Sequence, residues 1–324
     1  MLAAYADAPN YDDPLAALKV GDHPDPVVPE GWVRIKMAAA SLNWHDLWAL
    51  RGMGSHWGRP ERFPIVIGCD GAGRLDDGTP VIIYPIIGNP NWKGDETLDP
   101  DREVLSERYN GMMAEYTVAP ARNVIPFSEG LSFPAAALMG ASWMTAYRML
   151  FIKSDLKPGQ SMLVQGAAGG VSTALIELGR AAGMEVWAAG RSEEKRALAK
   201  RLGAHHTIES GAKLPVQVDA VLDTVGEATW EHSIASVRTG GTIVTCGMSG
   251  GAVGKTDIPR IWIEQINIRG TFNGTLQELR DLVSFVVLHK LNPYVGSLFP
   301  LKRTEEALRK LADGKQLGKI VLEI

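Results

Sequence analysis

Cysteine is scarce in this chain of 324 residues, which contains only Cys69 and Cys246. Two cysteines cannot form a disulfide framework or a four-cysteine zinc site. The chain also lacks any apolar run close to the roughly 20 residues of a membrane-spanning helix. Residues 1–13 are acidic and have neither the basic region nor the apolar stretch of a signal peptide. We therefore expect a cytoplasmic protein that does not enter a membrane.

No single sign of charge dominates the composition. The formal net charge is -4 and the isoelectric point is near 6.0, which gives no sign of a surface for nucleic acid. Apolar residues make up 45% of the chain and charged residues 22%, an ordinary balance for a globular protein. The length predicts two domains with an ample core.

The first 125 residues are β-rich, and the chain changes character after them. Alternating apolar and polar residues predict a strand near residues 31–38, and apolar runs predict others at 63–67 and 79–84. Residues 87–110 are rich in polar residues, proline and glycine, which predicts a long surface loop. From Ser161 onward strands alternate with helices, which predicts an α/β fold with a doubly wound parallel sheet.

A glycine-containing turn in residues 161–183 joins a short apolar run to a helical pattern. Strand, turn and helix in this order open a dinucleotide-binding fold, where amides at the helix N-terminus bind a pyrophosphate. The G-x-G-x-x-G positions fall on Ala167, Gly169 and Ser172, so glycine-rich turns of other α/β proteins also fit. The Ser172 side chain either packs against the sheet or turns its hydroxyl towards the phosphates. The candidate cofactor-binding residues of this turn are Gly166, Ala167, Ala168, Gly169, Gly170 and Val171.

The end of the next predicted strand indicates which dinucleotide binds. An NAD site usually has an acidic residue there to accept from the ribose hydroxyl, but this chain has Gly190 followed by Arg191 and Ser192. A small residue leaves room for a 2′-phosphate, which a guanidinium binds in bidentate fashion, and Lys195 adds charge one helical turn later. Arg191 and Lys195 also fit the alternative of solvated surface cations. We expect NADPH.

Several short motifs, in their order and spacing, resemble the medium-chain dehydrogenase/reductase superfamily and its zinc-free quinone oxidoreductase-like branch. The matching stretches begin at Asn43, Gly68, Gly111, Thr145, Gly166, Asp223 and Gly318. The resemblance implies a β-rich GroES-like catalytic domain built from residues 1–125 and 268–324. It implies an NADPH-binding Rossmann domain at 126–267, inserted in the first domain, with substrate and nicotinamide meeting between the two. It also implies a homodimer formed through the edge strand at 267–272.

The same resemblance predicts that no metal is bound. The catalytic zinc ligands of the superfamily's alcohol dehydrogenases correspond to Asn43, Cys69 and Ala141 here, so one potential ligand of another type remains. The region that carries the structural zinc in those relatives has no cysteine. His45, Asp46, Cys69 and Asp70 are close to one another by analogy, which leaves an unusual site open. We expect Cys69 to be a small core residue instead.

Without a Lewis acid, hydride transfer is easier to a conjugated acceptor, which spreads the developing charge. We therefore expect transfer from NADPH to a quinone or an α,β-unsaturated carbonyl. The alternatives are a zinc-type alcohol dehydrogenase with altered ligands and a non-catalytic nucleotide-binding relative. His45 is a further candidate, as proton donor, although such a histidine is more often packed or solvated. By resemblance the catalytic candidates are Asn43, Asp46 and Thr145, and Tyr84 is added because it ends a strand at the cleft, where its phenol can form a hydrogen bond. Asn43 and Asp46 equally fit an Asx-type turn at the start of a short helix. Three tryptophans either line an apolar pocket or belong to the core, namely Trp44, Trp48 and Trp57. By resemblance the remaining cofactor contacts are Gly226, Gly247, Phe272 and Asn273.

Overall fold

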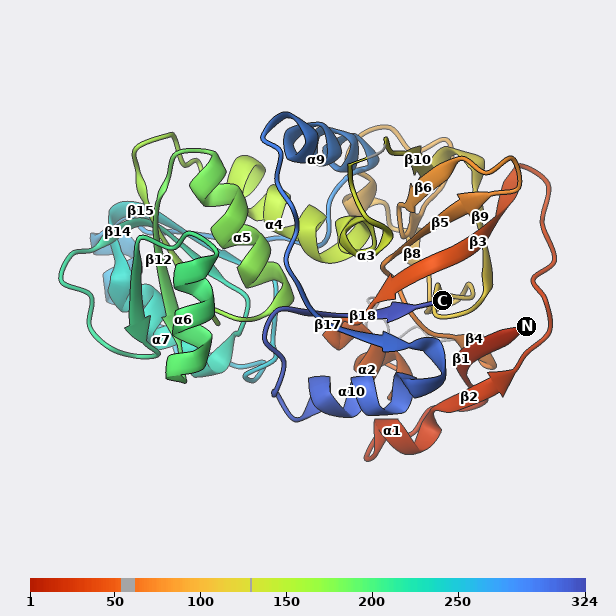
Figure 1. The fold of residues 1–324 in the computed structure, drawn as a ribbon. Helices are drawn as coiled ribbons and strands as arrows, with labels where there is room; N and C mark the ends of the chain where they lie inside the picture. The colour runs from red at the N-terminus through yellow and green to blue at the C-terminus, as the bar shows by residue number, and fades with distance from the viewer. Residues whose placement is uncertain (54–61, 129) are drawn as a thin grey trace. The chain divides into compact units, whose positions relative to one another are not determined.

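The chain divides into two units, and the second is inserted in the first. The computed structural model describes residues 1–53, 62–128 and 130–324 (Figure 1). Unit 1 consists of Met1–Ser142 and Thr275–Ile324, and unit 2 of Trp143–Gly274. Within the described residues no helix is both long enough and apolar enough to cross a membrane.

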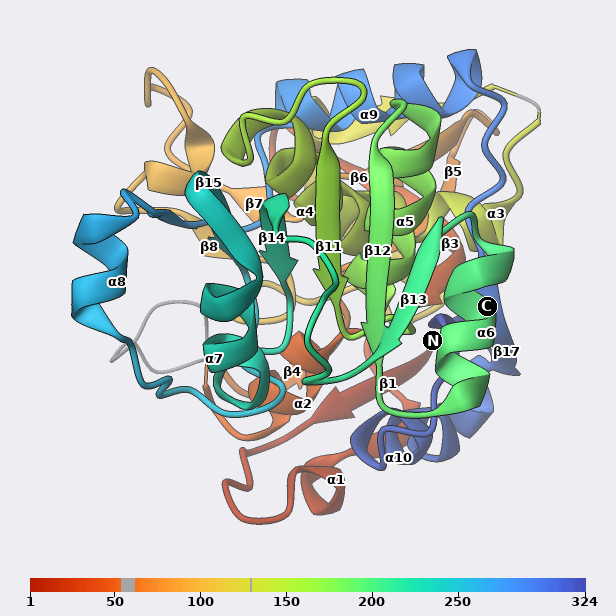
Figure 2. The ribbon, with the colours of Figure 1, turned by 90° about the vertical axis from the view of Figure 1, so that its left-hand side faces the viewer.

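Unit 2 is built on a six-stranded parallel sheet with the strand order β13-β12-β11-β14-β15-β16 (Figure 2). Its strands are β11 (Ser161–Gln165), β12 (Glu185–Gly190), β13 (His206–Glu209), β14 (Val218–Asp223), β15 (Val237–Thr245) and β16 (Asn267–Gly270). Its helices are α4 (Met144–Tyr147), α5 (Gly170–Ala181), α6 (Glu193–Arg201), α7 (Glu227–Ser236) and α8 (Ile258–Ile263).

The order of strands in unit 2 reverses direction at β11. Strands β12 and β13 follow on one side of it, and β14, β15 and β16 on the other. Because parallel crossovers are right-handed, α5 and α6 cover one face of the sheet and α7 the other. The central strands are therefore buried on both faces, which is why they are rich in apolar residues.

Unit 1 is β-rich, and its largest sheet has the order β10-β6-β5-β3-β18-β17, with β9 also paired to β3. Its strands are β1 (Leu2–Ala6), β2 (Lys19–Asp22), β3 (Trp32–Ser41), β4 (Ile65–Val66), β5 (Gly71–Leu75), β6 (Pro80–Ile83), β7 (Ile86–Ile87), β8 (Glu103–Val104), β9 (Tyr116–Pro120), β10 (Val124–Pro126), β17 (Val295–Pro300) and β18 (Lys319–Glu323). Its helices are α1 (Pro14–Ala17), α2 (Trp44–Leu50), α3 (Phe133–Ala136), α9 (Leu276–Leu288) and α10 (Thr304–Ala312).

Strand β18 brings the C-terminal segment into the sheet of the N-terminal segment. It runs antiparallel to β3, with Val321 opposite Ser41, and parallel to β17. Both ends of the chain therefore share one core. The predicted fold class, a doubly wound parallel sheet inserted in a β-rich GroES-like unit, is confirmed.

The prediction of a long surface loop at residues 87–110 is wrong for the end of that segment. Strand β7 pairs with β8, and Leu105 and Glu107 beyond it are buried. The polar composition concealed this because the buried Glu107 carboxylate has a partner within the fold, His45.

Candidate functional site

The glycine turn lies at the carboxyl edge of the unit 2 sheet. Gly166 follows β11 with a φ of 75°, in the left-handed region that glycine adopts without strain. Gly169 is the N-cap of α5, so the first free amides of that helix follow it at Gly170 and Val171. Ala167 and Ala168, between them, are buried. This turn presents helix amides where a pyrophosphate would bind.

Ser172 packs against the sheet. Its side chain is fully buried, and its hydroxyl donates to the Gln165 carbonyl oxygen at 2.9 Å. The Thr224 hydroxyl lies 3.0 Å from it. The hydroxyl thus links the ends of β11 and β14 to the first turn of α5, which fixes the turn in place of the third glycine.

The other candidate cofactor residues follow neighbouring strands at the same edge. Gly226 follows β14 and donates its N–H to Asp223 Oδ1 at 3.0 Å, and Gly247 follows β15. Phe272 and Asn273 follow β16. The Asn273 side-chain oxygen and the Thr271 hydroxyl are both buried without a hydrogen-bond partner among the described residues. Such atoms fit a polar ligand that completes their hydrogen bonds.

The end of β12 carries the residues predicted to distinguish NADPH from NADH. A Cβ atom at Gly190 would lie 3.1 Å from the Ala167 Cβ, so the strand end has little room for a larger side chain. The next helix begins here, since the Ser192 hydroxyl oxygen accepts from the Lys195 N–H at 3.3 Å. Burial first, and then repulsion from the Arg191 guanidinium, lower the pKa of Lys195. The charges of the two cations are therefore coupled.

Thr145 and Tyr84, two of the catalytic candidates, belong to different units. Thr145 lies on α4 in unit 2 and is half-buried. Tyr84 directly follows β6 in unit 1 and is almost fully buried, and its backbone exchanges hydrogen bonds with Asn123. Of the tryptophans that the sequence suggested as pocket residues, Trp57 lies outside the described part of the chain.

Asn43 and Asp46 together form the start of α2. The Asp46 Oδ2 atom accepts from the Asn43 N–H at 2.7 Å, which is one half of a capping box. The Asn43 side chain donates to the Ser41 carbonyl oxygen at 3.2 Å and accepts from Lys319 Nζ at 2.8 Å. Asn43 is thus held rigidly, and its second amide hydrogen faces Cys69 Sγ at 3.8 Å.

Asp70 is a buried residue whose carboxylate has several partners near the start of α2. Its carboxylate accepts from the Ser41 hydroxyl at 2.8 Å and from the Ala141 N–H at 3.0 Å, and Lys319 Nζ lies 3.7 Å away. Burial raises the pKa of the Asp70 carboxyl although these neighbours oppose the shift, and burial lowers the pKa of Lys319. Each charge stabilises the other, because both side chains are buried and water does not solvate them.

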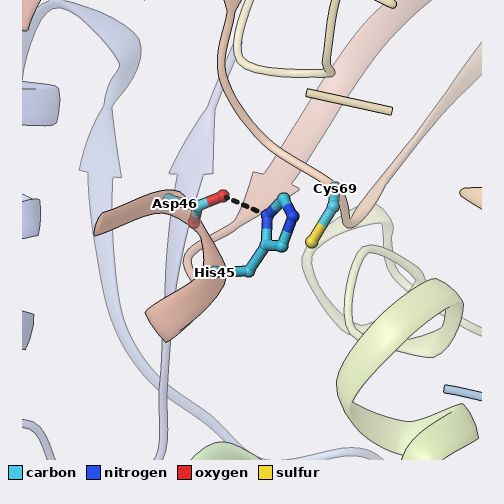
Figure 3. A group of neighbouring side chains, drawn as sticks. All are labelled: His45, Asp46 and Cys69. Atoms are coloured by element: carbon cyan, nitrogen blue, oxygen red, sulfur yellow. Dashed lines mark ion pairs between the residues drawn. The ribbon is translucent and has the colours of Figure 1, made fainter. Parts of the chain in front are cut away.

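His45 lies between two carboxylates and a thiol in unit 1 (Figure 3). Its Nε2 atom is 2.8 Å from Glu107 Oε1, and its Nδ1 atom is 4.0 Å from Asp46 Oδ1. Burial alone would lower the pKa of His45, but Cys69, Asp46 and Glu107 together raise it well above its ordinary value. Burial raises the pKa of the Cys69 thiol. Cys69 is a small buried residue, as the sequence predicted.

The residues at the family's catalytic zinc positions do not fit that metal as a set. Ala141 has no donor atom, and the Asn43 oxygen already accepts from Lys319. Only Cys69 offers a zinc ligand. Sequence reasoning also missed two residues of this site. Glu107 lay in a segment without a motif, and Lys319 lay in a recognised terminal motif to which no role was assigned.

Comparison with known proteins gives matches over both units. A model of the alcohol dehydrogenase GroES-like domain matches residues 29–129, and one of zinc-binding dehydrogenases matches 170–287. A zinc-type alcohol dehydrogenase-like protein of Schizosaccharomyces pombe is 32% identical over 91% of both chains. An acryloyl-coenzyme A reductase of Sulfurisphaera tokodaii is 24% identical over 96% of this chain and 97% of its own. A solved NAD-dependent alcohol dehydrogenase is 31% identical, with a TM-score of 0.92 over 100% of both chains.

Proposed function

Because the chain belongs to the medium-chain dehydrogenase/reductase superfamily of oxidoreductases, we propose that it is an NADPH-dependent reductase of quinones or α,β-unsaturated carbonyl compounds. NADPH supplies the hydride when bound. The carboxyl edge of the unit 2 sheet holds the cofactor, with the pyrophosphate at the N-terminus of α5.

The pairing of Arg191 with Lys195 supports NADPH over NADH. Repulsion from Arg191 contributes to the lowered pKa of Lys195, and a phosphate dianion between the two cations would relieve that repulsion. A carboxylate, which would accept from the ribose hydroxyl of NADH, is missing at Gly190. We expect Arg191→Ala to weaken NADPH binding without changing NADH binding, as measured by nicotinamide fluorescence.

The observation that carries the choice of substrate is the donor set at the zinc positions. At the family's ligand positions, Asn43 and Ala141 cannot hold the zinc that acts there as a Lewis acid on a plain ketone or alcohol. A conjugated acceptor spreads the developing negative charge over several atoms, so its reduction depends less on a Lewis acid. Its oxygen replaces Cys69 Sγ as the acceptor of the second Asn43 amide hydrogen, and Asp46 holds the Asn43 backbone in place.

The roles of the remaining candidates follow from this assignment. We propose that Thr145 and Tyr84 lie beside the reacting groups, as in the sequence-based prediction. An enone gains hydride at its β-carbon and a proton at its α-carbon, and a quinone gains both to become a hydroquinone. The name of the Sulfurisphaera tokodaii relative, an acryloyl-coenzyme A reductase, is in keeping with a conjugated acceptor.

The second candidate is an alcohol dehydrogenase with altered ligands, which the names of the relatives at 31% and 32% identity favour. A panel of quinones, enones, saturated ketones and primary alcohols separates the two, with cofactor absorbance as the readout. Turnover of conjugated acceptors, lost in Asn43→Ala, supports the proposal. Turnover of alcohols and saturated ketones alone rejects it, and NADPH binding without turnover of any compound identifies a non-catalytic relative.

We also propose that the protein is a cytoplasmic homodimer that pairs through the outer edge of the unit 2 sheet. Among the residues that the structure describes, β16 is the last strand of that sheet and pairs with β15 on one side only. Large apolar side chains are exposed on β16 and on α8, namely Ile258, Trp262, Ile263 and Ile268. Such a patch beside an unpaired strand edge favours contact with a second copy.

A further inference from the structure

We propose that His45, Asp46 and Cys69 form a binding site for a divalent metal ion of the zinc type. The site differs from the zinc positions of the superfamily, with which it shares only Cys69. The proposal does not rest on the proposed reaction, since it concerns binding in the absence of cofactor and substrate.

In Figure 3 the Asp46 carboxylate lies on one side of the His45 ring and the Cys69 sulfur on the other. One atom from each residue lies within 4.8 Å of the other two. His45 Nδ1 and Asp46 Oδ1 are both buried and have no hydrogen-bond partner among the described residues. They lie 4.0 Å apart, too far for a hydrogen bond. They form only a long ion pair, and buried polar atoms beside a thiol that lack hydrogen bonds are costly unless something lies between them.

Glu107 sets the imidazole in the orientation that a metal ligand needs. Its Oε1 atom lies 2.8 Å from His45 Nε2, on the side of the ring away from Asp46. A carboxylate at Nε2 holds the proton there and leaves the lone pair on Nδ1. Histidine ligands in metalloproteins are regularly held in this way, by a carboxylate on the other ring nitrogen.

Asp46 is oriented in a comparable way. Its Oδ2 atom accepts from the Asn43 N–H, which leaves Oδ1 to face His45 Nδ1 at 4.0 Å. Because that hydrogen bond belongs to the start of α2, the carboxylate cannot turn away without opening the helix end. Cys69 follows Gly68 in the segment between β4 and β5, so a bound metal would join α2 to that segment.

The donor set selects the type of metal. One imidazole nitrogen, one carboxylate oxygen and one thiolate suit zinc or cobalt, whereas calcium and magnesium prefer oxygen ligands alone. Bonds of about 2.0–2.3 Å in a tetrahedral site place neighbouring ligand atoms about 3.5 Å apart. The observed separations therefore need only a small inward movement, and a fourth position remains for water.

The experiment uses the full chain, freed of metal with a chelator and then titrated with Co²⁺ or Zn²⁺. We expect about one ion per chain and, with Co²⁺, the charge-transfer absorption of a cobalt–thiolate bond. Cys69→Ser should abolish that absorption, and both Cys69→Ser and His45→Gln should weaken Zn²⁺ binding at least about 100-fold, the upper range for loss of a supporting residue. Mg²⁺ should not compete.

Cys246→Ser is the matched control, because it removes the other cysteine, and it should bind metal as the native chain does. Circular dichroism of each variant shows whether the fold is intact, and His45→Gln keeps the test open if Cys69→Ser misfolds. A native chain that binds no Co²⁺, or an absorption that survives in Cys69→Ser, overturns the proposal. NADPH turnover of conjugated acceptors is measured separately on the chelator-treated chain, so failure of metal binding and failure of the proposed reaction are distinguishable.

Discussion

Lys319 Nζ donates to Asn43 Oδ1 at 2.8 Å, and this contact joins the last strand of the chain to the N-cap of α2. The same ammonium donates to the Leu42 carbonyl oxygen at 2.6 Å and lies 3.7 Å from Asp70 Oδ2. Lys319 is buried, so these oxygens replace its water. A cation inserted here fixes both the candidate substrate-binding amide and the buried carboxylate beneath it.

Lys319→Met is predicted to destabilise the protein by about 3–5 kcal/mol, because it leaves a buried carboxylate and an amide oxygen without their cation. The measurement is the free energy of unfolding in urea, followed by circular dichroism. Lys315→Met is the control, since Lys315 pairs with Asp313 at the surface and should not shift the unfolding midpoint. Equal shifts in the two variants would show that the buried network contributes nothing.

The parts of the fold with local signals could be predicted from the sequence. A strand, a small-residue turn and an amphipathic helix follow one another in residues 161–183, and each can be recognised from a pattern of a few neighbouring residues. The role of Ser172 could not be predicted, because its hydroxyl bonds to the ends of two strands, one of them 52 positions away. Sequence periodicity carries no information about which strand ends meet.

The site in unit 1 shows the same limit. Asn43 and Asp46 are three positions apart, so a capping arrangement could be weighed from the sequence alone. Glu107 reaches His45 from 62 positions away, out of a segment whose composition is that of a surface loop. A buried acid in such a segment becomes recognisable only when the fold supplies its partner.

Gly190→Asp is predicted to weaken NADPH binding by at least about 100-fold relative to NADH, because a carboxylate there repels the 2′-phosphate. Gly190→Ala is the matched control for crowding, since its Cβ would lie 3.1 Å from the Ala167 Cβ and 3.2 Å from the Arg196 Cγ. The alanine variant should weaken the binding of NADPH and of NADH to a similar, small extent. Dissociation constants from fluorescence titration measure the two effects, and an aspartate variant that keeps its NADPH preference would contradict the proposed phosphate position.

Ile268→Lys is predicted to convert the proposed dimer to a monomer. Ile268 lies on β16, where 40% of its surface is exposed, and a lysine on a strand edge opposes pairing with another strand. Sedimentation velocity at several concentrations measures the change in mass. Leu288→Lys is the control, because Leu288 is 76% exposed and lies at the end of α9, in unit 1.

The two variants separate loss of a specific interface from a general gain in charge. Both replace an exposed aliphatic side chain with lysine, so they change net charge and surface hydrophobicity in the same direction. If Leu288→Lys dissociates the native assembly and Ile268→Lys does not, the interface lies elsewhere. If only Ile268→Lys dissociates it, the unpaired edge of β16 is where the second copy binds, since the added charge there blocks the ladder of hydrogen bonds that would extend the sheet across the dimer.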